Sequence, residues 1–556
     1  MFLKLLASVV GTVLIYTAYR ILTLVYQELN SPLRALRGPK SSHFIWGNAR
    51  ELLNDPALHE KWVQMYGRTL KYPFFFGLSR LYTSDSRALN HFLTNHNIYQ
   101  RPEPNTYLLS LIVGPGVLVT EGDVHRRQRK IMNPAFGPQQ IRELTPIFVT
   151  KSVELRDIWM SQAASGSAQI DAVSWLNKTT LDIIGLAGFG YRFDSLSAKK
   201  PTELAAAFAV TINAVASLSV LDTVRAWIPA LRAIPSNFDS LARTSQDAMG
   251  RIGREIIWNS KEEMVGSGTL ETDRGRDLLS LLVRANMASD VPESQRLSEE
   301  EVLAQSANNQ KRVSTFLIAG HETTGTTWAL FALTQNIPAQ TRLRVELLGV
   351  DTEAPTMDEL NALPYLDCVV REALRVYPPV VSTGRVAMRD DVVPLDRPWT
   401  DVNGIVHETL RVAKGQHVII PIRSMNRDKE IWGANAAEFM CLRISLIIIC
   451  GCAQREYIGS PERWESDPPL SSNLPGVWSQ VLTFLGGPRA CIGYRFSVVE
   501  MKALLFTLVR VFEFELAVPA ADIGRKFSIV QHPIVQRDPG AGPQMPLLVK
   551  PYIRLA

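Results

Sequence analysis

Cysteine is scarce in this chain, with five residues among 556. The five positions have no framework spacing and are odd in number, which argues against a disulfide scaffold and favours a reducing compartment. They are Cys368, Cys441, Cys450, Cys452 and Cys491. Interdomain linkers are missing as well, because no composition shift or internal repeat divides the chain after residue 50. We therefore predict one large domain behind an N-terminal segment.

Charged residues make up only 20% of the chain, and the net charge is a small +5. So small an excess gives no reason to expect a nucleic acid as partner, although it suits an acidic membrane surface or an acidic redox partner. The chain contains no phosphate-binding loop and no nicotinamide or flavin signature. The run Gly185-Leu-Ala-Gly-Phe-Gly190 follows a helical pattern instead of a strand, which favours close helix packing. The chain therefore has no evident electron source of its own.

The first residues of the chain are apolar. Residues 5–19 carry no charge, Arg20 interrupts, and residues 21–27 are again uncharged. An apolar span of about 23 residues is long enough to cross a bilayer. The alternative is a cleaved signal peptide, but the stretch is long and ends without a clear small-x-small cleavage site. We predict a retained, single-pass membrane helix.

The segment after this helix is basic. Residues 29–50 contain four cations and no acid, so we expect the body of the protein to face the cytosol. The predicted organisation is a membrane anchor over residues 1–28, a basic and proline-containing hinge over 29–50, and a catalytic domain over 51–556.

Helical spacing dominates the rest of the chain. Helices are predicted over residues 58–66, 86–95, 125–133, 138–161, 173–185, 202–220, 236–265, 298–335, 338–350, 357–376 and 494–511. Strands are predicted over residues 70–76, 78–83, 418–421 and 512–516, with hairpins near the C-terminus. This balance predicts an α+β fold that is predominantly helical.

The most informative stretch is Phe484-Leu-Gly-Gly-Pro-Arg-Ala-Cys-Ile-Gly493. Its glycines, Gly487 and Gly493 among them, let the backbone pass close to a large flat group. Backbone N–H groups in such a loop can hold the Cys491 sulfur as a thiolate. Arg489 can reach an anionic edge of that group, and Phe484 can cover the sulfur. An ordinary surface turn would not need this combination.

The pattern Phe-x-x-Gly-x-Arg-x-Cys-x-Gly resembles the haem-binding loop of the cytochrome P-450 family. The resemblance implies that Cys491 is the axial ligand of haem b, iron protoporphyrin IX.

A second motif is Ala319-Gly-His-Glu-Thr-Thr324, within a long apolar helix pattern. A threonine hydroxyl there can bond a backbone carbonyl and widen the helix, which makes a polar notch in an apolar wall. The notch suits proton delivery to bound O₂, with Thr323 as donor and Glu322 linking to water. An amphipathic helix with its polar face in solvent is the alternative. The family pattern also matches here.

A third motif is Glu372-Ala-Leu-Arg375, in which the two charges lie on one helical face and can pair. Alone it is usually a solvated pair, but Tyr377-Pro-Pro379 follows and ends the helix. The resemblance adds Arg463 as a third member of a buried charge network.

A fourth motif begins with Gly122-Asp-Val-His-Arg-Arg-Gln-Arg-Lys130 and places His125 and Arg129 on one helical face. They could clamp a haem propionate, although the family often has tryptophan in place of His125. Arg385 matches the family's other propionate contact. The remaining charges of this motif form either a solvated face or a dock for a reductase. They are Arg126, Arg127 and Lys130.

The resemblance covers nearly the whole chain and is closest to membrane-anchored, fungal members of the family. It implies an enzyme of the endoplasmic reticulum membrane that receives electrons from NADPH-cytochrome P-450 reductase. The implied reaction inserts one oxygen atom from O₂ into a lipophilic small molecule. A secondary metabolite such as a terpenoid is the first expectation, while fatty acids and foreign aromatic compounds stay open. The pocket is expected from residues 107–113, 208–220, 316–319, 380–383 and 532–537.

One segment departs from the family. Residues 440–460 separate Phe439 from Pro461, where the family has almost no spacing. We interpret this insert as a retained intron, in preference to a metal clip at Cys450-Gly-Cys452. The insert leaves open a catalytically impaired haem protein. An enzyme that rearranges peroxides without a reductase is a third possibility, which the Glu322-Thr323 pair disfavours.

Overall fold

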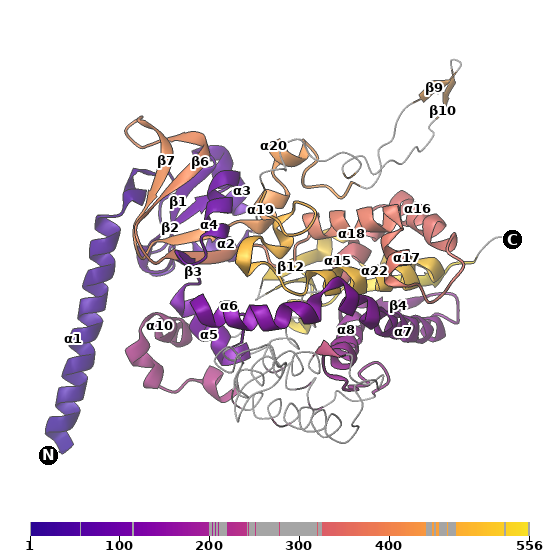
Figure 1. Ribbon diagram of the computed structural model, residues 1–556, viewed down its shortest axis with the longest axis horizontal. Coiled ribbons are helices and arrows are strands. Elements are labelled where there is room, and N and C mark those ends of the chain that lie inside the picture. Colours follow the sequence, from indigo (N-terminus) through magenta and orange to yellow (C-terminus); the bar gives the residue numbers. More distant parts are fainter. Residues whose placement is uncertain are drawn as a thin grey trace.

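The computed structural model describes most of the chain (Figure 1). It covers residues 2–55, 57–113, 116–198, 219–241, 325–440, 474–527 and 530–553, with shorter pieces at 203, 206, 210, 243, 251, 277–278, 320, 447–449, 452–454 and 464. The prediction of a predominantly helical α+β fold is confirmed. A helical body carries a smaller region of strands on one side, and α1 stands away from both.

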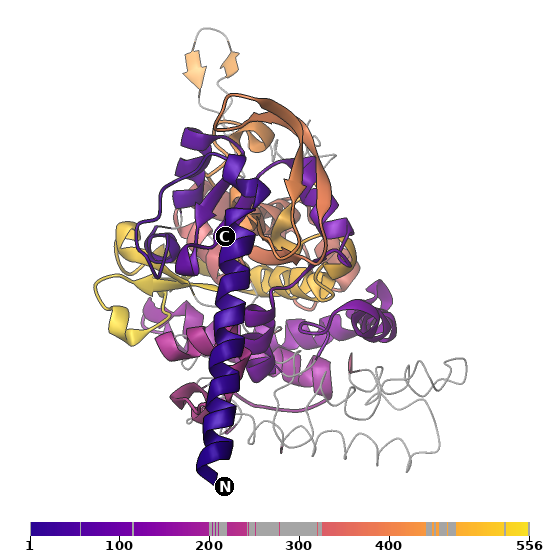
Figure 2. The ribbon, with the colours of Figure 1, turned by 90° about the vertical axis from the view of Figure 1, so that its left-hand side faces the viewer.

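The N-terminal helix α1 (Phe2–Leu29) projects beside the body, and Figure 2 shows it in front of the strand region. None of the helices in the described part of the chain is long and apolar enough to cross a membrane. The end of α1 is attached to the body, because the Glu28 carboxylate accepts bonds from the Ser79 N–H (3.0 Å) and hydroxyl (2.5 Å). Leu33 and Leu36 follow and are buried. The region after α1 is therefore packed against the strands.

The strand region is a five-stranded sheet of order β1-β2-β8-β5-β3 with a hairpin, β6–β7, beside it. Only the β2–β8 pairing in this sheet is parallel. The strands are β1 (Thr69–Pro73), β2 (Ser79–Thr83), β3 (Tyr99–Gln100), β5 (Thr383–Ala387), β6 (Asp391–Thr400), β7 (Val406–Val412) and β8 (His417–Ile420). The helices next to them are α2 (Ala49–Asn54), α3 (Leu58–Tyr66) and α4 (Ser86–Thr94).

At the centre of the helical body lies α22 (Tyr494–Val511), with α7 (Pro138–Gln162) packed along it. Phe496 and all of residues 498–509 are buried, as expected for a helix surrounded by protein on every side. The neighbouring helices are α8 (Ala172–Phe189), α15 (Thr326–Thr334), α16 (Ile337–Leu348), α17 (Met357–Asn361) and α18 (Pro364–Val376). Because α22 begins directly after the cysteine loop, this core fixes the position of Cys491.

Shorter elements complete the described body. They are α5 (Glu103–Val113), α6 (Gly122–Met132), α10 (Val220–Trp227), α19 (Ile422–Asn426) and α20 (Lys429–Trp432). The remaining strands are β4 (Ala168–Asp171), β11 (Phe512–Leu516), β12 (Ile523–Phe527), β13 (Gln531–Val535) and β14 (Pro546–Pro551). Strands β11, β14 and β4 form one sheet, and β12 pairs with β13. The predicted C-terminal hairpins are therefore represented by β12–β13 and by the return strand β14.

One predicted helix is wrong in its extent. Residues 357–376 form two helices, α17 and α18, because Pro364 has no N–H to continue the first and sits in the first turn of the second. The predicted helices over 202–220, 236–265 and most of 298–335 fall largely outside the described residues. The insert is described only at Met440 and at β9 (Ile447–Ile449) and β10 (Cys452–Gln454), which pair as an antiparallel hairpin that projects from the body.

Candidate active site

The loop before Cys491 is tightly folded. The Val477 N–H donates to the Leu485 carbonyl (2.9 Å), and the Cys491 N–H donates to the Phe484 carbonyl (2.8 Å). Three residues in this loop adopt left-handed backbone angles without being glycine: Ser479 (φ 50°), Gln480 (φ 54°) and Leu485 (φ 56°). Such angles cost free energy and persist only where the surrounding structure holds them. The loop is thus a fixed support for the cysteine.

Two glycines of the loop are required because neighbouring backbone carbonyls leave no room for a side chain. Gly487 has φ +68°, and a Cβ there would lie 2.4 Å from the Leu93 carbonyl oxygen. A Cβ on Gly486 would lie 1.3 Å from the Pro475 carbonyl oxygen. Gly493 is different, since a Cβ there would approach nothing closer than Phe136 at 3.9 Å. Only Gly493 therefore borders free space beside the cysteine.

Cys491 is accessible to solvent and yet lies among many protein atoms. It is exposed, yet burial raises the pKa of its thiol. The exposure and the raised pKa are compatible if protein atoms surround the sulfur on several sides but leave one side open. The Gly493 N–H and the Arg129 guanidinium oppose the effect and lower this pKa. These two groups are what a thiolate needs to remain ionised away from water.

Phe484 lies under aromatic cover close to this sulfur. Its side chain is 8% exposed, with ring centroids 5.6 Å from Trp478 and 6.0 Å from Tyr494. The Phe484 carbonyl accepts the hydrogen bond from the Cys491 N–H. Phe484 therefore orients the cysteine through its backbone, while its ring lies next to the cysteine loop.

Strand β5 carries a buried arginine that pairs with no acidic side chain among the described residues. Arg385 is 2% exposed, and its Nη1 donates to the Thr383 hydroxyl (3.1 Å) and the Gly384 carbonyl (2.8 Å). Its Nη2 is buried and has no partner among the residues that the structure describes. Burial, with a contribution from Arg101, lowers the pKa of Arg385 to about 9. A desolvated guanidinium with an unused N–H requires an anion.

Arg101 belongs to the same cluster and was missed in the sequence, because it lies in none of the four motifs. Burial lowers the pKa of Arg101 to about 10, and its Nε lacks a partner. Its charge also lowers the pKa values of Arg385 and His125. Mutually repelling arginines in a buried place indicate that a further negative group belongs there.

The helix α6 brings His125 and Arg129 to this cluster. His125 is 3% exposed, and burial, Arg129 and Arg101 lower its pKa to about 4, so it is neutral at pH 7. A neutral imidazole still donates one N–H. Arg129 donates to the Ala490 carbonyl (2.7 Å) and the Asn133 side chain (3.0 Å). Arg129 therefore ties α6 to the cysteine loop.

Arg489 has protein partners. Its guanidinium pairs with the Glu121 carboxylate and donates to the carbonyls of Thr120 (2.5 Å) and Val117 (3.3 Å). The sequence analysis assigned Arg489 to an anionic edge of the cofactor but missed Glu121, which is 368 positions away.

These observations fit a flat group with an acidic edge. The exposed side of Cys491 and the space at Gly493, where an added Cβ would come no closer than 3.9 Å to a described atom, would admit the ring. Arg385, Arg101 and His125 would hold the acidic edge, since buried Arg385 and half-buried Arg101 each have a buried N–H without a partner among the described residues. The donor set therefore suits an iron porphyrin held by one thiolate.

The proposed proton-delivery residues Glu322 and Thr323 lie outside the described residues, but both flanks of their motif are placed. A Cβ on Gly320 would lie 2.8 Å from Ile184 of α8, and one on Gly325 would lie 2.8 Å from Leu374 of α18. The backbone at Gly320 and at Gly325 is therefore closely packed against α8 and α18 respectively.

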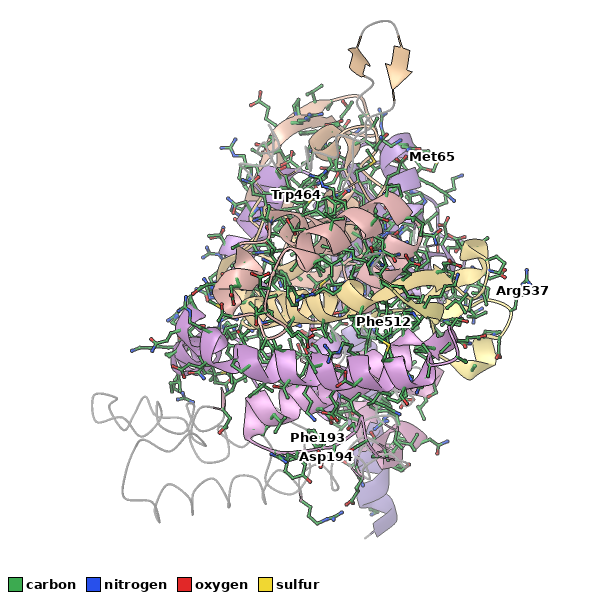
Figure 3. The ribbon with its side chains drawn as sticks, turned by 90° about the vertical axis from the view of Figure 1, so that its right-hand side faces the viewer. Met65, Phe193, Asp194, Trp464, Phe512 and Arg537 are labelled. Carbon is green, nitrogen blue, oxygen red and sulfur yellow. The ribbon has the colours of Figure 1, made fainter. Side chains whose placement is uncertain are left out.

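The Glu372–Arg375 pair is fully buried and bidentate, with N–O distances of 2.8 and 2.7 Å. Arg375 also donates to the carbonyls of Asn426 (2.6 Å) and Ala436 (2.5 Å). The Trp464 indole N–H donates to Glu372 (3.2 Å), and Figure 3 labels this residue. Arg463, the third predicted member, lies outside the described residues.

One expected pocket position lies elsewhere. The Arg537 side chain is 75% exposed, pairs with Asp522 at 3.0 Å and projects from the edge of the body (Figure 3). Arg537 therefore belongs to the surface and does not line the pocket.

Comparison with known proteins identifies the family of this chain. The sequence model described as "Cytochrome P-450" matches residues 37–445 and 460–534, with a break that falls within the insert. Cytochrome P-450 monooxygenase 128 of Postia placenta is 47% identical over 98% of this chain and 97% of its own length. Cytochrome P-450 monooxygenase 205 of the same fungus is 48% identical over 96% of both.

A further relative, cytochrome P-450 monooxygenase claO of Ampulloclitocybe clavipes, is 34% identical over 93% of both chains. The family match and these identities extend over nearly the whole length. The chain therefore belongs to the cytochrome P-450 family.

Proposed function

We propose that this protein is a haem-thiolate monooxygenase that inserts one oxygen atom from O₂ into a lipophilic small molecule. The observation that carries the proposal is the exposed Cys491 in its glycine-rich loop, together with the Arg385 and Arg101 N–H groups that have no partner among the described residues. The names of the relatives, all cytochrome P-450 monooxygenases, support it.

Each residue of the site has a role in this proposal. Cys491 would be the axial ligand, and the Gly493 N–H and Arg129 would keep its sulfur ionised. Arg385 and Arg101 would hold the acidic edge of haem b. The haem, when bound, supplies the activation of O₂ that the protein's side chains cannot perform. Thr323 and Glu322 would deliver protons in this reaction.

The substrate is proposed to be a lipophilic secondary metabolite such as a terpenoid. Residues 107–113 of α5 read Tyr-Leu-Leu-Ser-Leu-Ile-Val, an apolar wall that suits such a molecule. A fatty acid or a foreign aromatic compound is the second candidate, because the same wall would accept an alkyl chain or ring.

Electrons are proposed to come from NADPH-cytochrome P-450 reductase. The sequence has no flavin or nicotinamide signature of its own. Exposed Arg126 and Lys130 lie on α6, the helix that also carries His125 and Arg129. A small cationic surface close to a redox centre suits a charge-steered, short-lived contact.

Membrane attachment through α1, at the endoplasmic reticulum with the catalytic domain in the cytosol, is also proposed. It is supported by the uncharged stretch over residues 5–19 and by the basic segment after it. The proposed boundaries are 1–28 for the anchor, 29–50 for the connecting segment and 51–556 for the catalytic domain. Extraction with alkaline carbonate tests it: the proposal requires the full chain to stay with the membranes, and release into the supernatant would overturn it.

The reaction class is tested by the spectrum of the reduced protein with carbon monoxide. A thiolate-type band followed by substrate-dependent NADPH consumption with added reductase supports the monooxygenase. A protein without that band would instead be the impaired form, for which the 440–460 insert is the motivating observation. A normal band without NADPH consumption, but with turnover of added peroxides, would indicate the peroxide-rearranging alternative.

A further inference from the structure

Three arginines from separate elements gather around Tyr377, the residue that follows α18. The guanidinium carbons of Arg427 and Arg525 lie 5.6 and 5.2 Å from the centroid of its ring. The third arginine, Arg423, belongs to α19, and Figure 1 labels α18, α19 and β12. Burial raises the pKa of the Tyr377 hydroxyl, and the charges of all three arginines oppose that effect. One ring is therefore surrounded by three cations.

Two of these arginines have partners that carry no charge. Arg427 donates through Nε to the Val376 carbonyl at 2.9 Å. Arg525 lies over the Tyr377 ring and also 5.4 Å from the centroid of the Trp328 ring of α15. Aromatic faces attract a cation, but they do not neutralise it. Arg427 and Arg525 are half-buried, so the cluster keeps access to solvent on their side.

The third arginine has no partner for its guanidinium. Arg423 is 8% exposed, and its Nε and Nη1 are both buried without a partner among the described residues. A guanidinium can only donate hydrogen bonds, and a buried one without acceptors is costly. Arg423 therefore requires acceptors that the described part of the chain does not supply.

One carboxylate lies near the cluster without neutralising it. Burial lowers the pKa of each of the three arginines, and the charge of Glu60 of α3 opposes that effect in all of them. Glu60 forms no ion pair with them among the described residues, and its Oε1 is buried without a partner. Asp55 also acts on Arg423, but it pairs with Lys61 at 2.6 Å. Three positive charges thus face one unpaired negative charge.

We propose that Arg423, Arg427 and Arg525 form an anion site that binds a phosphate group with two negative charges. The two positive charges that Glu60 leaves over match a dianion, whereas a single carboxylate would neutralise only one of them. A phosphate also presents acceptor oxygens in several directions, which suits guanidinium groups from separate elements. The phosphate belongs to a free small molecule or to a lipid headgroup. The site does not depend on the proposed reaction.

The test titrates inorganic phosphate into the full-length protein and follows the melting temperature, with potassium chloride at equal ionic strength as the reference. In the wild type the melting temperature should rise and level off, as binding to one site requires. Arg423→Met should raise the dissociation constant about tenfold to a hundredfold, the factor that corresponds to one lost charge-assisted hydrogen bond.

The matched control is Lys526→Met. Lys526 is exposed and follows Arg525 on β12, where successive side chains point to opposite faces of the hairpin. The phosphate affinity of this control should stay within about twofold of the wild type. Without phosphate, Arg423→Met should melt no lower than the wild type, because the variant removes a buried charge that lacks a partner. That comparison separates a lost site from a damaged fold.

Vesicles identify the source of the phosphate. Phosphatidylcholine vesicles that contain phosphatidic acid should weaken the apparent affinity for inorganic phosphate if the headgroup reaches the site, relative to vesicles of phosphatidylcholine alone. Equal affinities with both vesicles would assign the site to a free phosphate.

Two results would overturn the proposal. One is a melting temperature that rises with phosphate without levelling off, which is the general effect of an excluded salt. The other is an equal dissociation constant for Arg423→Met and the wild type. Either result would mean that water between Glu60 and Arg423 completes the cluster.

Discussion

Arg385 gives the sharpest prediction, because its charge should affect the haem-free and haem-loaded protein in opposite directions. The change is Arg385→Met, which keeps an unbranched side chain and removes the guanidinium. The half-buried Thr383 hydroxyl and Gly384 carbonyl, which Arg385 contacts, can turn to water. In the haem-free protein the variant should therefore be more stable, and its haem affinity should be lower.

The magnitude follows from the buried charge. Lowering the pKa of Arg385 from 12.5 to about 9 corresponds to about 5 kcal/mol. The lowered pKa means that this penalty is present below pH 9 and fades between pH 9 and 12.5. Relaxation and water penetration reduce the net effect, so removal of the charge should stabilise the haem-free protein by about 1–3 kcal/mol.

The haem-loaded protein should behave in the opposite way. Loss of one charge-assisted hydrogen bond to a carboxylate costs about 1.5–3 kcal/mol. That cost corresponds to a haem dissociation constant raised about tenfold to a hundredfold. The two measurements are urea unfolding of the protein expressed without haem, and transfer of haem to an excess of apomyoglobin. Arg389→Met is the control, because Arg389 is exposed four positions further on.

Two results would contradict this reasoning. A less stable haem-free variant would mean that the Arg385 charge has an acidic partner in the haem-free fold. Unchanged haem transfer would mean that its free Nη2 does not meet the cofactor.

Three further predictions concern the support of the site. Gly487→Ala forces a left-handed angle and a 2.4 Å approach to Leu93, so it should lower the unfolding free energy by about 1–3 kcal/mol; an unchanged melting temperature would refute this. Arg375→Ala removes the bidentate cation from the fully buried Glu372 and should cost about 3–5 kcal/mol in urea unfolding; a loss below about 1 kcal/mol would argue against a buried pair. The pKa of His125 is lowered to about 4, so the unfolded state binds a proton more readily and stability should fall as the pH drops from 6.5 to 4. His125→Trp should remove about 3 kcal/mol of this acid sensitivity, and identical pH profiles would exclude the assignment.

Local chemistry made part of the site predictable. The cysteine loop is encoded in ten consecutive positions, and the Glu372–Arg375 pair follows from the spacing of one helix. The bounds of α3, α22 and β11 were predicted as observed, since each has strong periodicity and a clear end. Such features need no knowledge of distant segments.

Long-range contacts could not be predicted from this sequence. Arg101 and Glu121 enter the site only because the chain returns to the cysteine loop after more than 360 residues. A second reason for glycine at 486 and 487 could not be predicted, because the carbonyls of Pro475 and Leu93, which occupy the space that a side chain would need, come from distant or irregular segments. A single helix over 357–376 looked continuous in its apolar pattern, and the rigid ring of Pro364 overrode that pattern.

The central claim is that the Cys491 sulfur binds the haem iron, and X-ray absorption at the iron edge of the purified protein measures this bond directly. The account predicts one sulfur neighbour in the wild type and none in Cys491→Ser. A sulfur neighbour that persists in the serine variant, or none in the wild type, would contradict it.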